Sequence, residues 1–358
     1  MARIGAYTAR GADKSKNEDS CCVKVATTAV GEIAMALVCD GVGGLGRGHL
    51  ASWSVADRFA QWFERELPLY VQLNMRLGNI DMTGVRDEWT RLLNQCNDEL
   101  YQLGVRQESQ MGTSFTGILA CRGVYVLAHV GDSRGYYVSP EESFPLTFDQ
   151  TFVSREIAAG NMTFEEAQYH PKRNVVLQAV GAQNGLAPDV SMGTYDPGAM
   201  FVVCSDGLYR TLEAPEFHET FASVISAEDS VIAEACATCV NLAISRGELD
   251  DITVAALAME AWAPQSVARA GAAPEEGTAL LGERDEDPFD EGEMPTTVLP
   301  GTGASASVEA SGLETETNTL TGRAFGLMTT VDLAREVVEP SDEDDEGETE
   351  DVTEAGDE

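Results

Sequence analysis

The sequence predicts an α+β fold in which antiparallel β-sheets are covered by helices. Two observations predict this class. Short apolar segments rich in Val, Ile and aromatic residues come in neighbouring pairs, which is typical of antiparallel sheets rather than of a βαβ series. Longer segments with apolar residues at helical spacing also occur, and the 43% hydrophobic content is enough to fill a sizeable core.

Six segments have the length and composition of β-strands. They are Ser20–Ala26, Ile33–Cys39, Ser114–Cys121, Val124–Val130, Met200–Cys204 and Ile252–Ala258. Three further segments are predicted helices, namely Leu50–Glu66, Val85–Val105 and Asp229–Ser245. The second helix has the clearest period, with Trp89, Leu92, Leu93, Cys96, Leu100 and Leu103 on one face. All nine segments lie before residue 260, so we expect one folded domain over residues 1–260.

The composition changes after Trp262, where Gly, Ala, Pro, Ser, Thr and acidic residues dominate. Positions 261–358 contain 4 basic and 26 acidic residues. Such a segment buries too little apolar surface to offset its chain entropy, so we predict a disordered acidic tail. Its one apolar stretch, Phe325–Val338, either forms a short helix on a partner or is an ordinary part of the tail. Thr296-Thr297 and Thr329-Thr330 would suit kinases or phosphothreonine-recognition modules, whereas the plainer alternative is a solubilising extension.

The charge balance excludes some classes of partner. The chain has 23 basic and 60 acidic residues and a formal net charge of −37, which disfavours nucleic acid and anionic membrane surfaces. No run of 18 apolar residues is present, and the N-terminal residues do not resemble a signal peptide. We therefore expect a cytoplasmic protein whose eight cysteines are thiols. Cys236 and Cys239 form a C-x-x-C pair on a predicted helix, where packing is the favoured interpretation over metal or redox chemistry.

Acidic residues recur at the ends of the predicted strands. Asp40, Asp132 and Asp206 each follow an apolar run, and Asp250-Asp251 precedes another. Glu18-Asp19 lies just before the first predicted strand. If these strand ends converge, the like charges need cations, and oxygen ligands in that number suit Mg²⁺ or Mn²⁺.

A pair of such metals can hold a hydroxide and orient a phosphoryl oxygen. A glycine after the acid, as at Gly41, lets the backbone carbonyl approach a metal closely. The four histidines are scattered without zinc spacing, and no Ser-His-Asp or Cys-His arrangement competes. Each acidic motif taken alone is more often a turn or a solvated surface, so the residues by themselves leave the metal site and an ordinary surface about equally open.

Six motifs occur in order along residues 4–258, and together they resemble the PPM family, the type-2C metal-dependent protein phosphatases, in its compact bacterial form. The motifs are Asn17-Glu18-Asp19-Ser20, Asp40-Gly41-Val42-Gly43-Gly44, Gly112-Thr113-Ser114, Val130-Gly131-Asp132-Ser133-Arg134, Ser205-Asp206-Gly207-Leu208 and Asp250-Asp251-Ile252-Thr253. The segment from Gly160 to Gly181 is similar to the family's flap. The resemblance implies two antiparallel sheets packed as a sandwich with helices outside, an α-β-β-α order.

The resemblance also implies a set of metal ligands. Asp40 would bridge two divalent cations, Mn²⁺ or Mg²⁺. Glu18 and Asp19 would serve the same cluster, Asp19 partly through water, and the Gly41 carbonyl would bind one ion. The other metal's shell would be completed by Asp206 and Asp250, while Asp132 would help to hold a third, weaker cation.

The implied activity is hydrolysis of phosphoserine and phosphothreonine in proteins. Hydroxide bridging the two metals would attack phosphorus in line, without a phospho-enzyme, and catalysis would consist mainly of positioning and charge neutralisation. The catalytic residues would be Asp40, Asp206 and Lys14. Phosphorylated proteins would be the substrates, and a Ser/Thr protein kinase would be the counterpart.

The chain departs from the family pattern at three positions. Lys14 stands where the family usually has Arg, which keeps the charge but loses the bidentate fork for phosphate. Asp251 replaces the usual Asn, and the extra carboxylate would either tighten cation binding or repel phosphate. Gln150 replaces a His that is not a core metal ligand.

These departures leave two alternatives open. A phosphatase-like domain with little or no activity would bind phosphoproteins as a regulatory module, and Lys14 and Asp251 favour it. A general small-molecule phosphomonoesterase would prefer metabolites over phosphoproteins. The complete set of acids, in contrast, favours the protein phosphatase.

Overall fold

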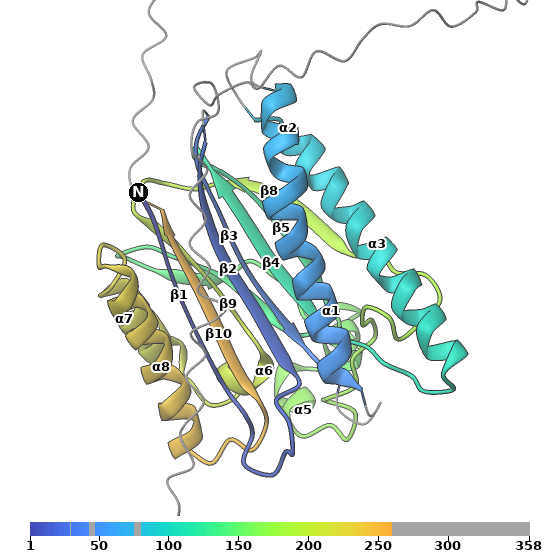
Figure 1. The fold of residues 1–358 in the computed structure, drawn as a ribbon. Coiled ribbons are helices and arrows are strands. Elements are labelled where there is room, and N and C mark those ends of the chain that lie inside the picture. The colour runs from blue at the N-terminus through green and yellow to red at the C-terminus, as the bar shows by residue number, and fades with distance from the viewer. Residues whose placement is uncertain (29, 43–46, 75–79, 260–358) are drawn as a thin grey trace, which may run out of the picture. The chain divides into compact units, whose positions relative to one another are not determined.

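Two antiparallel sheets pack face to face, and helices cover both outer faces (Figure 1). The computed structural model describes residues 1–28, 30–42, 47–74 and 80–259. Over these residues the predicted α-β-β-α sandwich is confirmed. The predicted tail, 261–358, and its apolar stretch lie outside the described residues.

Each sheet contains five strands within the described residues, and every neighbouring pair is antiparallel. The first sheet has the order β1 (Ala2–Ala9), β10 (Ile252–Met259), β9 (Ala199–Cys204), β6 (Arg134–Val138) and β7 (Ser143–Pro145). The second has the order β2 (Asp19–Thr28), β3 (Gly31–Asp40), β4 (Phe115–Cys121), β5 (Val124–Val130) and β8 (Asp189–Thr194). Strands β4, β9 and β10 are buried along their whole length, because one face meets the other sheet and the other face meets helices.

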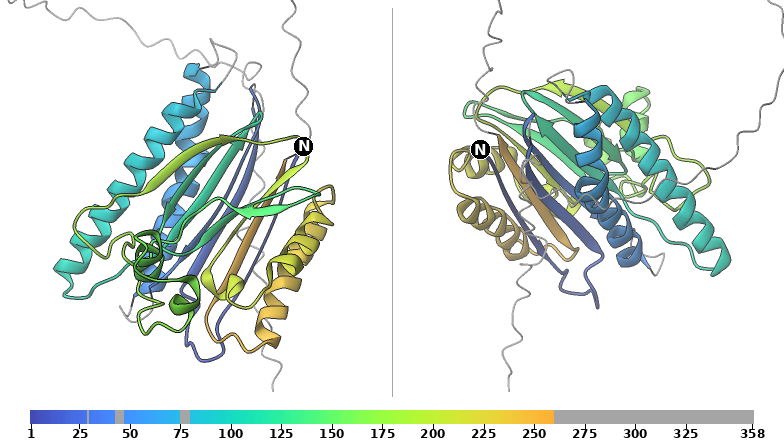
Figure 2. Two further views of the ribbon diagram at one scale, coloured as in Figure 1. Left: turned by 180° about the vertical axis from the view of Figure 1, so that it is seen from behind. Right: turned by 45° about the horizontal axis from the view of Figure 1, so that its top comes forward.

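The outer layers are formed by long helices (Figures 1 and 2). The second sheet is covered by α1 (Gly48–Gln61), the π-helical turn η1 (Trp62–Glu66), α2 (Leu67–Asn74) and α3 (Met82–Arg106). The first sheet is covered by α7 (Ala214–Ala222) and α8 (Asp229–Ser245). Between β7 and β8 lie α4 (Phe152–Ala158) and α5 (Phe164–Gln168), and α6 (Asp206–Tyr209) follows β9 directly.

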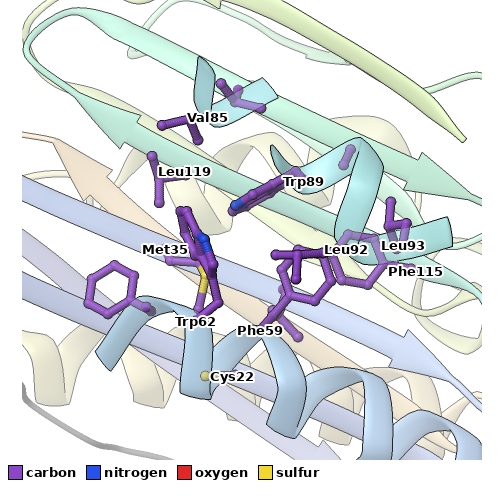
Figure 3. Packing of buried hydrophobic residues seen from close by; sticks show 14 of the residues in the cluster. Cys22, Met35, Phe59, Trp62, Val85, Trp89, Leu92, Leu93, Phe115 and Leu119 are labelled. Atoms are coloured by element: carbon purple, nitrogen blue, oxygen red, sulfur yellow. The ribbon is translucent and has the colours of Figure 1, made fainter. Parts of the chain in front are cut away.

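An aromatic cluster fixes α1 and α3 on the second sheet (Figure 3). The Trp89 ring lies edge-on to Phe59 and Trp62, with centroid distances of 5.2 and 5.9 Å, and its centroid is 6.4 Å from that of Phe115 in β4. All four side chains are fully buried. Edge-to-face pairs of this kind add to the stabilisation from burial itself, so the helix layer is held firmly against the strands.

The six predicted strands and three predicted helices are confirmed, and one helix end differs from its prediction by more than three residues. The first predicted helix was expected to end at Glu66, but the helical path continues through α2 to Asn74. Pro68 lacks an N–H, and the chain widens into the π-helical turn immediately before it instead of stopping. The α4–α7 helices and strands β1, β6, β7 and β8 were not predicted.

All eight cysteines are free thiols, as predicted, and seven are buried. Cys236 and Cys239 both face the core under α8, which confirms the packing interpretation. In the part of the chain that the structure describes, no helix has the length and apolar character needed to cross a membrane.

Candidate metal centre

Asp19 and Asp40 are brought together by the pairing of β2 with β3. The first residue of β2 is Asp19 and the last residue of β3 is Asp40, and the antiparallel register places them directly opposite each other. The backbone carbonyl of Asp40 accepts hydrogen bonds from the Ser114 N–H at 2.7 Å and from the Thr113 hydroxyl at 2.9 Å. The end of β3 is therefore fixed by the start of β4.

Three more acids reach this end of the sandwich from the neighbouring strands. Asp206 is the first residue of α6, immediately after β9, and Asp250 lies just before β10, the partner of β9. Asp132 occupies the short turn between β5 in one sheet and β6 in the other. Both sheets thus contribute acids to the same end of the sandwich.

The electrostatics show how closely these carboxylates are gathered. Burial raises the pKa of Asp40 well above its ordinary value, and four neighbouring carboxylates raise it further, those of Asp19, Asp206, Asp132 and Asp250. Burial raises the pKa of Asp206 to about 8, with Asp132 the next cause. Burial also raises the pKa of Asp19 to about 7; the nearby hydroxyl groups of Thr253 and Ser205 act in the opposite direction without forming a hydrogen bond of regular geometry to the carboxylate. A site with several acids that resist ionisation together is one that a cation stabilises.

Three oxygens in the site lack hydrogen-bond partners. Both carboxylate oxygens of Asp19 and the Oδ1 atom of Asp206 are buried and accept no hydrogen bond. Unpaired buried acceptors are costly, and they are tolerated where another ligand completes them. Hard carboxylate oxygens left free in this way fit Mg²⁺ or Mn²⁺, so the donor set suits the metals that the sequence predicted.

Gly41 allows the backbone to close around the site. The Gly41 N–H donates to the Glu18 carbonyl at 3.0 Å. A Cβ atom on Gly41 would lie 2.5 Å from both the Glu18 carbonyl oxygen and the Gly48 carbonyl carbon. No side chain fits there, which explains the glycine physically. The same arrangement places Glu18 Oε1 beside Gly48, where a Cβ would lie only 2.9 Å away.

Two basic side chains bind the acids of the site. The Lys14 ammonium contacts Asp250 Oδ1 and lies 3.1 Å from Asp251 Oδ2. The Arg210 guanidinium contacts Asp206 Oδ2 and lies 3.7 Å from Asp250 Oδ2. Among the described residues, no three Asp, Glu, His or Cys side chains are arranged as a ready ligand cluster. Asp206 and Asp250 each direct at least one oxygen to these basic side chains.

The protein phosphatase 2C family model matches residues 8–238 of the chain. The chain belongs to the protein phosphatase 2C family. Protein phosphatase PhpP of Streptococcus pneumoniae is 29% identical over 227 residues, which cover 63% of this chain and 85% of PhpP. The solved serine/threonine phosphatase of S. agalactiae is 28% identical, with a TM-score of 0.61, over 73% of this chain and 100% of that one.

A metal-bound relative is also among the similar structures. It is the catalytic domain of the serine threonine protein phosphatase PstP in complex with two manganese ions, 26% identical, with a TM-score of 0.54, over 73% of this chain and 99% of that one. These findings confirm the family that the six motifs indicated.

Asp251, which stands where the family usually has Asn, has a structural role that the sequence did not reveal. Its side chain is 1% exposed, and it binds the loop between β1 and β2 rather than facing an open site. Oδ1 accepts the Gly11 N–H at 2.8 Å, and Oδ2 accepts the Glu18 N–H at 2.8 Å and the Lys14 ammonium at 3.1 Å. Its predicted effect on the site, either tighter cation binding or phosphate repulsion, stays a prediction. Lys14 and Asp251, two of the three residues that differ from the family pattern, therefore contact each other.

The third departure, Gln150, supports the turn that carries Asp132. Its Oε1 atom accepts the Gly131 N–H at 3.0 Å. Next to it, Asp149 receives two hydrogen bonds from Arg134, of 2.8 and 2.7 Å. The Arg134 guanidinium lies 3.6 Å from the Tyr209 ring centroid, and the Tyr209 hydroxyl donates to the Asp132 carbonyl at 2.9 Å. These contacts fix the Asp132 turn from both sides.

Sequence reasoning found the acids but missed the groups that organise them. The structure brings together Asp19, Asp40, Asp132, Asp206 and Asp250, with Lys14 in contact with Asp250. Glu18 and Gly41 lie at the adjoining backbone crossing rather than among the mutually interacting carboxylates. Arg210 was not anticipated. The only sequence signal for it is its place four residues after Asp206, a spacing at which side chains on a helical turn meet.

Proposed function

We propose that this domain is a metal-dependent phosphatase that removes phosphate from phosphoserine and phosphothreonine in proteins. The observation that carries the proposal is the group of five aspartates from both sheets, whose buried oxygens are partly unpaired. Membership of the 2C family supports the same reaction class. The names of the relatives, such as PhpP and the S. agalactiae serine/threonine phosphatase, support the protein substrate.

The acids divide into groups by their position. Asp40, opposite Asp19, is surrounded by the other four aspartates and is suited to contact two cations. Asp206 and Asp250 come from the other sheet and would complete one ion's shell. Glu18 and the Gly41 carbonyl would serve from the crossing of β2 and β3. When bound, Mn²⁺ or Mg²⁺ would neutralise the phosphoryl oxygens and lower the pKa of an attacking water.

The remaining steps would involve the side chains of the protein and the substrate itself. Lys14, a quarter exposed beside Asp250, is positioned to pair with a phosphoryl oxygen as charge develops on it. A bond forms between the water oxygen and phosphorus, and the bond between phosphorus and the Ser or Thr oxygen breaks. A proton passes to the leaving oxygen, giving the free hydroxyl and inorganic phosphate. The attacking water gives up one proton in the same reaction, so the proton taken up by the leaving oxygen is balanced.

The proposal extends to partners. Its substrates would be cytoplasmic phosphoproteins whose phosphate is added by a Ser/Thr kinase. The acidic residues 261–358 would remain outside catalysis, and their threonine pairs would bind phosphothreonine-recognition modules when phosphorylated.

The test is hydrolysis of a phosphothreonine peptide by the purified full chain, in Mn²⁺, in Mg²⁺ and in EDTA. The proposal expects turnover with metal and none with EDTA. It also expects a higher kcat/KM for the peptide than for small phosphate esters. Tight peptide binding without turnover in any metal would instead establish the phosphoprotein-binding module. Preference for metabolites would establish the general phosphomonoesterase.

A further inference from the structure

Arg210 is the basic residue that contacts Asp206. It follows α6 directly, four residues after Asp206, so its side chain returns toward the start of that helical turn. Its Nη2 atom contacts Asp206 Oδ2, and its Nη1 atom lies 3.7 Å from Asp250 Oδ2. The Arg210 side chain is one-third exposed, whereas that of Asp206, which it contacts, is 8% exposed.

The same guanidinium acts on Asp132. Tyr209, the residue before Arg210, donates its hydroxyl to the Asp132 carbonyl at 2.9 Å, and the positive charge of Arg210 acts on the Asp132 carboxylate. Arg210 therefore places its positive charge beside Asp206, at the end of β9, and near Asp132 in the β5–β6 turn.

Asp132 is the residue that the family resemblance assigned to a third cation, and Arg210 brings a positive charge to the same part of the site. We propose that the Arg210 guanidinium supplies this positive charge permanently, so that the domain binds two divalent cations and not three. The inference rests on the proposed metal centre. It concerns the number of ions and the role of Asp132, which interacts with the charge of Arg210 instead of binding a metal.

The division of the Asp206 oxygens supports this arrangement. Oδ2 contacts Arg210, whereas Oδ1 is buried and has no partner. One oxygen is thus committed to the guanidinium and the other remains for the two-cation centre with Asp40 and Asp250. A divalent cation placed at Oδ2 beside Asp132 would meet the positive guanidinium at close range in a site with little solvent, which strongly disfavours both being present.

The experiment is equilibrium dialysis of the full chain, stripped with EDTA and then titrated with Mn²⁺ alone. Wild type, Arg210→Gln and Arg210→Lys are compared, together with Asp132→Asn. Because every variant carries the same acidic residues 261–358, weak binding there cancels in the differences. Wild type is expected to hold two ions, and Arg210→Gln is expected to hold one more. Arg210→Lys keeps the charge and should behave as wild type.

Asp132→Asn provides a second arm that does not depend on removing Arg210. If Arg210 replaces the third ion, Asp132→Asn in the wild-type background leaves the number of bound Mn²⁺ unchanged. The same change in Arg210→Gln abolishes the added site. A decrease from three ions to two on Asp132→Asn alone would overturn the inference, as would equal numbers for wild type and a folded Arg210→Gln. Binding of no ions by any variant would overturn the proposed metal centre itself.

Discussion

Replacing Asp251 by Asn tests whether this buried carboxylate holds the loop that carries Glu18. The carboxylate accepts two backbone N–H groups, from Gly11 and Glu18, each at 2.8 Å, and also binds Lys14. An Asn side chain has one acceptor oxygen and one NH₂ group. Whichever way the amide is turned, either the Gly11 or the Glu18 N–H faces a donor and loses its partner.

The magnitude follows from these contacts. An unpaired buried N–H costs about 1–3 kcal/mol. Lys14 is a quarter exposed, so the loss of its ion pair with Asp251 adds only about 0–1 kcal/mol. We expect Asp251→Asn to lower the free energy of unfolding by about 2–3 kcal/mol, and to lower the Tm by roughly 5–10 °C. The Mn²⁺ concentration needed for half-maximal activity should rise, because the displaced loop carries Glu18 and leads into Asp19.

The assay is urea and thermal denaturation of the full chain, followed by circular dichroism in EDTA. Asp87→Asn is the matched control, since Asp87 is 66% exposed on α3 and pairs only with the adjacent Arg86 among the ion pairs of the described residues. The control should change the free energy of unfolding by less than about 0.5 kcal/mol. A similarly small change for Asp251→Asn would refute the assigned role.

Three further predictions concern the acids, the glycine and the aromatic cluster. The raised pKa values of Asp19, about 7, and Asp206, about 8, mean that the folded protein binds protons which the unfolded chain has already released above about pH 4. The free energy of unfolding in EDTA should therefore fall as the pH rises from about 5.5 to 8, and Mn²⁺ should make this dependence on pH weaker. Urea titrations in EDTA that show a constant or rising free energy of unfolding over this range would contradict the prediction. Gly41→Ala places a methyl group against backbone atoms of Glu18 and Gly48. We expect it to lower kcat at saturating Mn²⁺ by about tenfold or more. An unchanged kcat would show that the backbone crossing tolerates a side chain. Trp89→Ala should lower the free energy of unfolding by about 3–5 kcal/mol in denaturation experiments, because it removes the buried ring that packs against Phe59 and Trp62. A loss below about 1 kcal/mol would show that the cluster is not tightly packed.

The strands that the sequence revealed are those buried on both faces. Continuous apolar runs such as β4 and β10 are easy to recognise, because every side chain enters a core. Strand β8 is mostly exposed at a sheet edge and contains Asp, Ser, Gly and Thr, so its composition gives no strand signal. Strand β1 is only partly buried and mixes Ala, Gly and Thr with larger residues, and its place in the sheet depends on pairing with β10, some 250 residues away.

The site divides in a similar way. The acids were predictable because each one follows or precedes a strand, and both sheets end at the same place. The contact between Lys14 and Asp251, two residues that differ from the family pattern, was not predictable. They are distant in sequence and meet only through the pairing of β1 with β10. The Arg210 contact depends on α6 beginning at Asp206 itself, a helix of four residues that carries no periodic signal.

The most direct test of the metal centre is the rate of phosphothreonine-peptide hydrolysis by Asp206→Asn in Mn²⁺, compared with wild type and Asp87→Asn. Asp206 supplies the unpaired buried Oδ1 atom, and Asn keeps its size while removing its charge. We expect kcat/KM to fall by about 100-fold or more for Asp206→Asn and to stay within about twofold of wild type for Asp87→Asn. Wild-type activity in a folded Asp206→Asn variant would contradict the account.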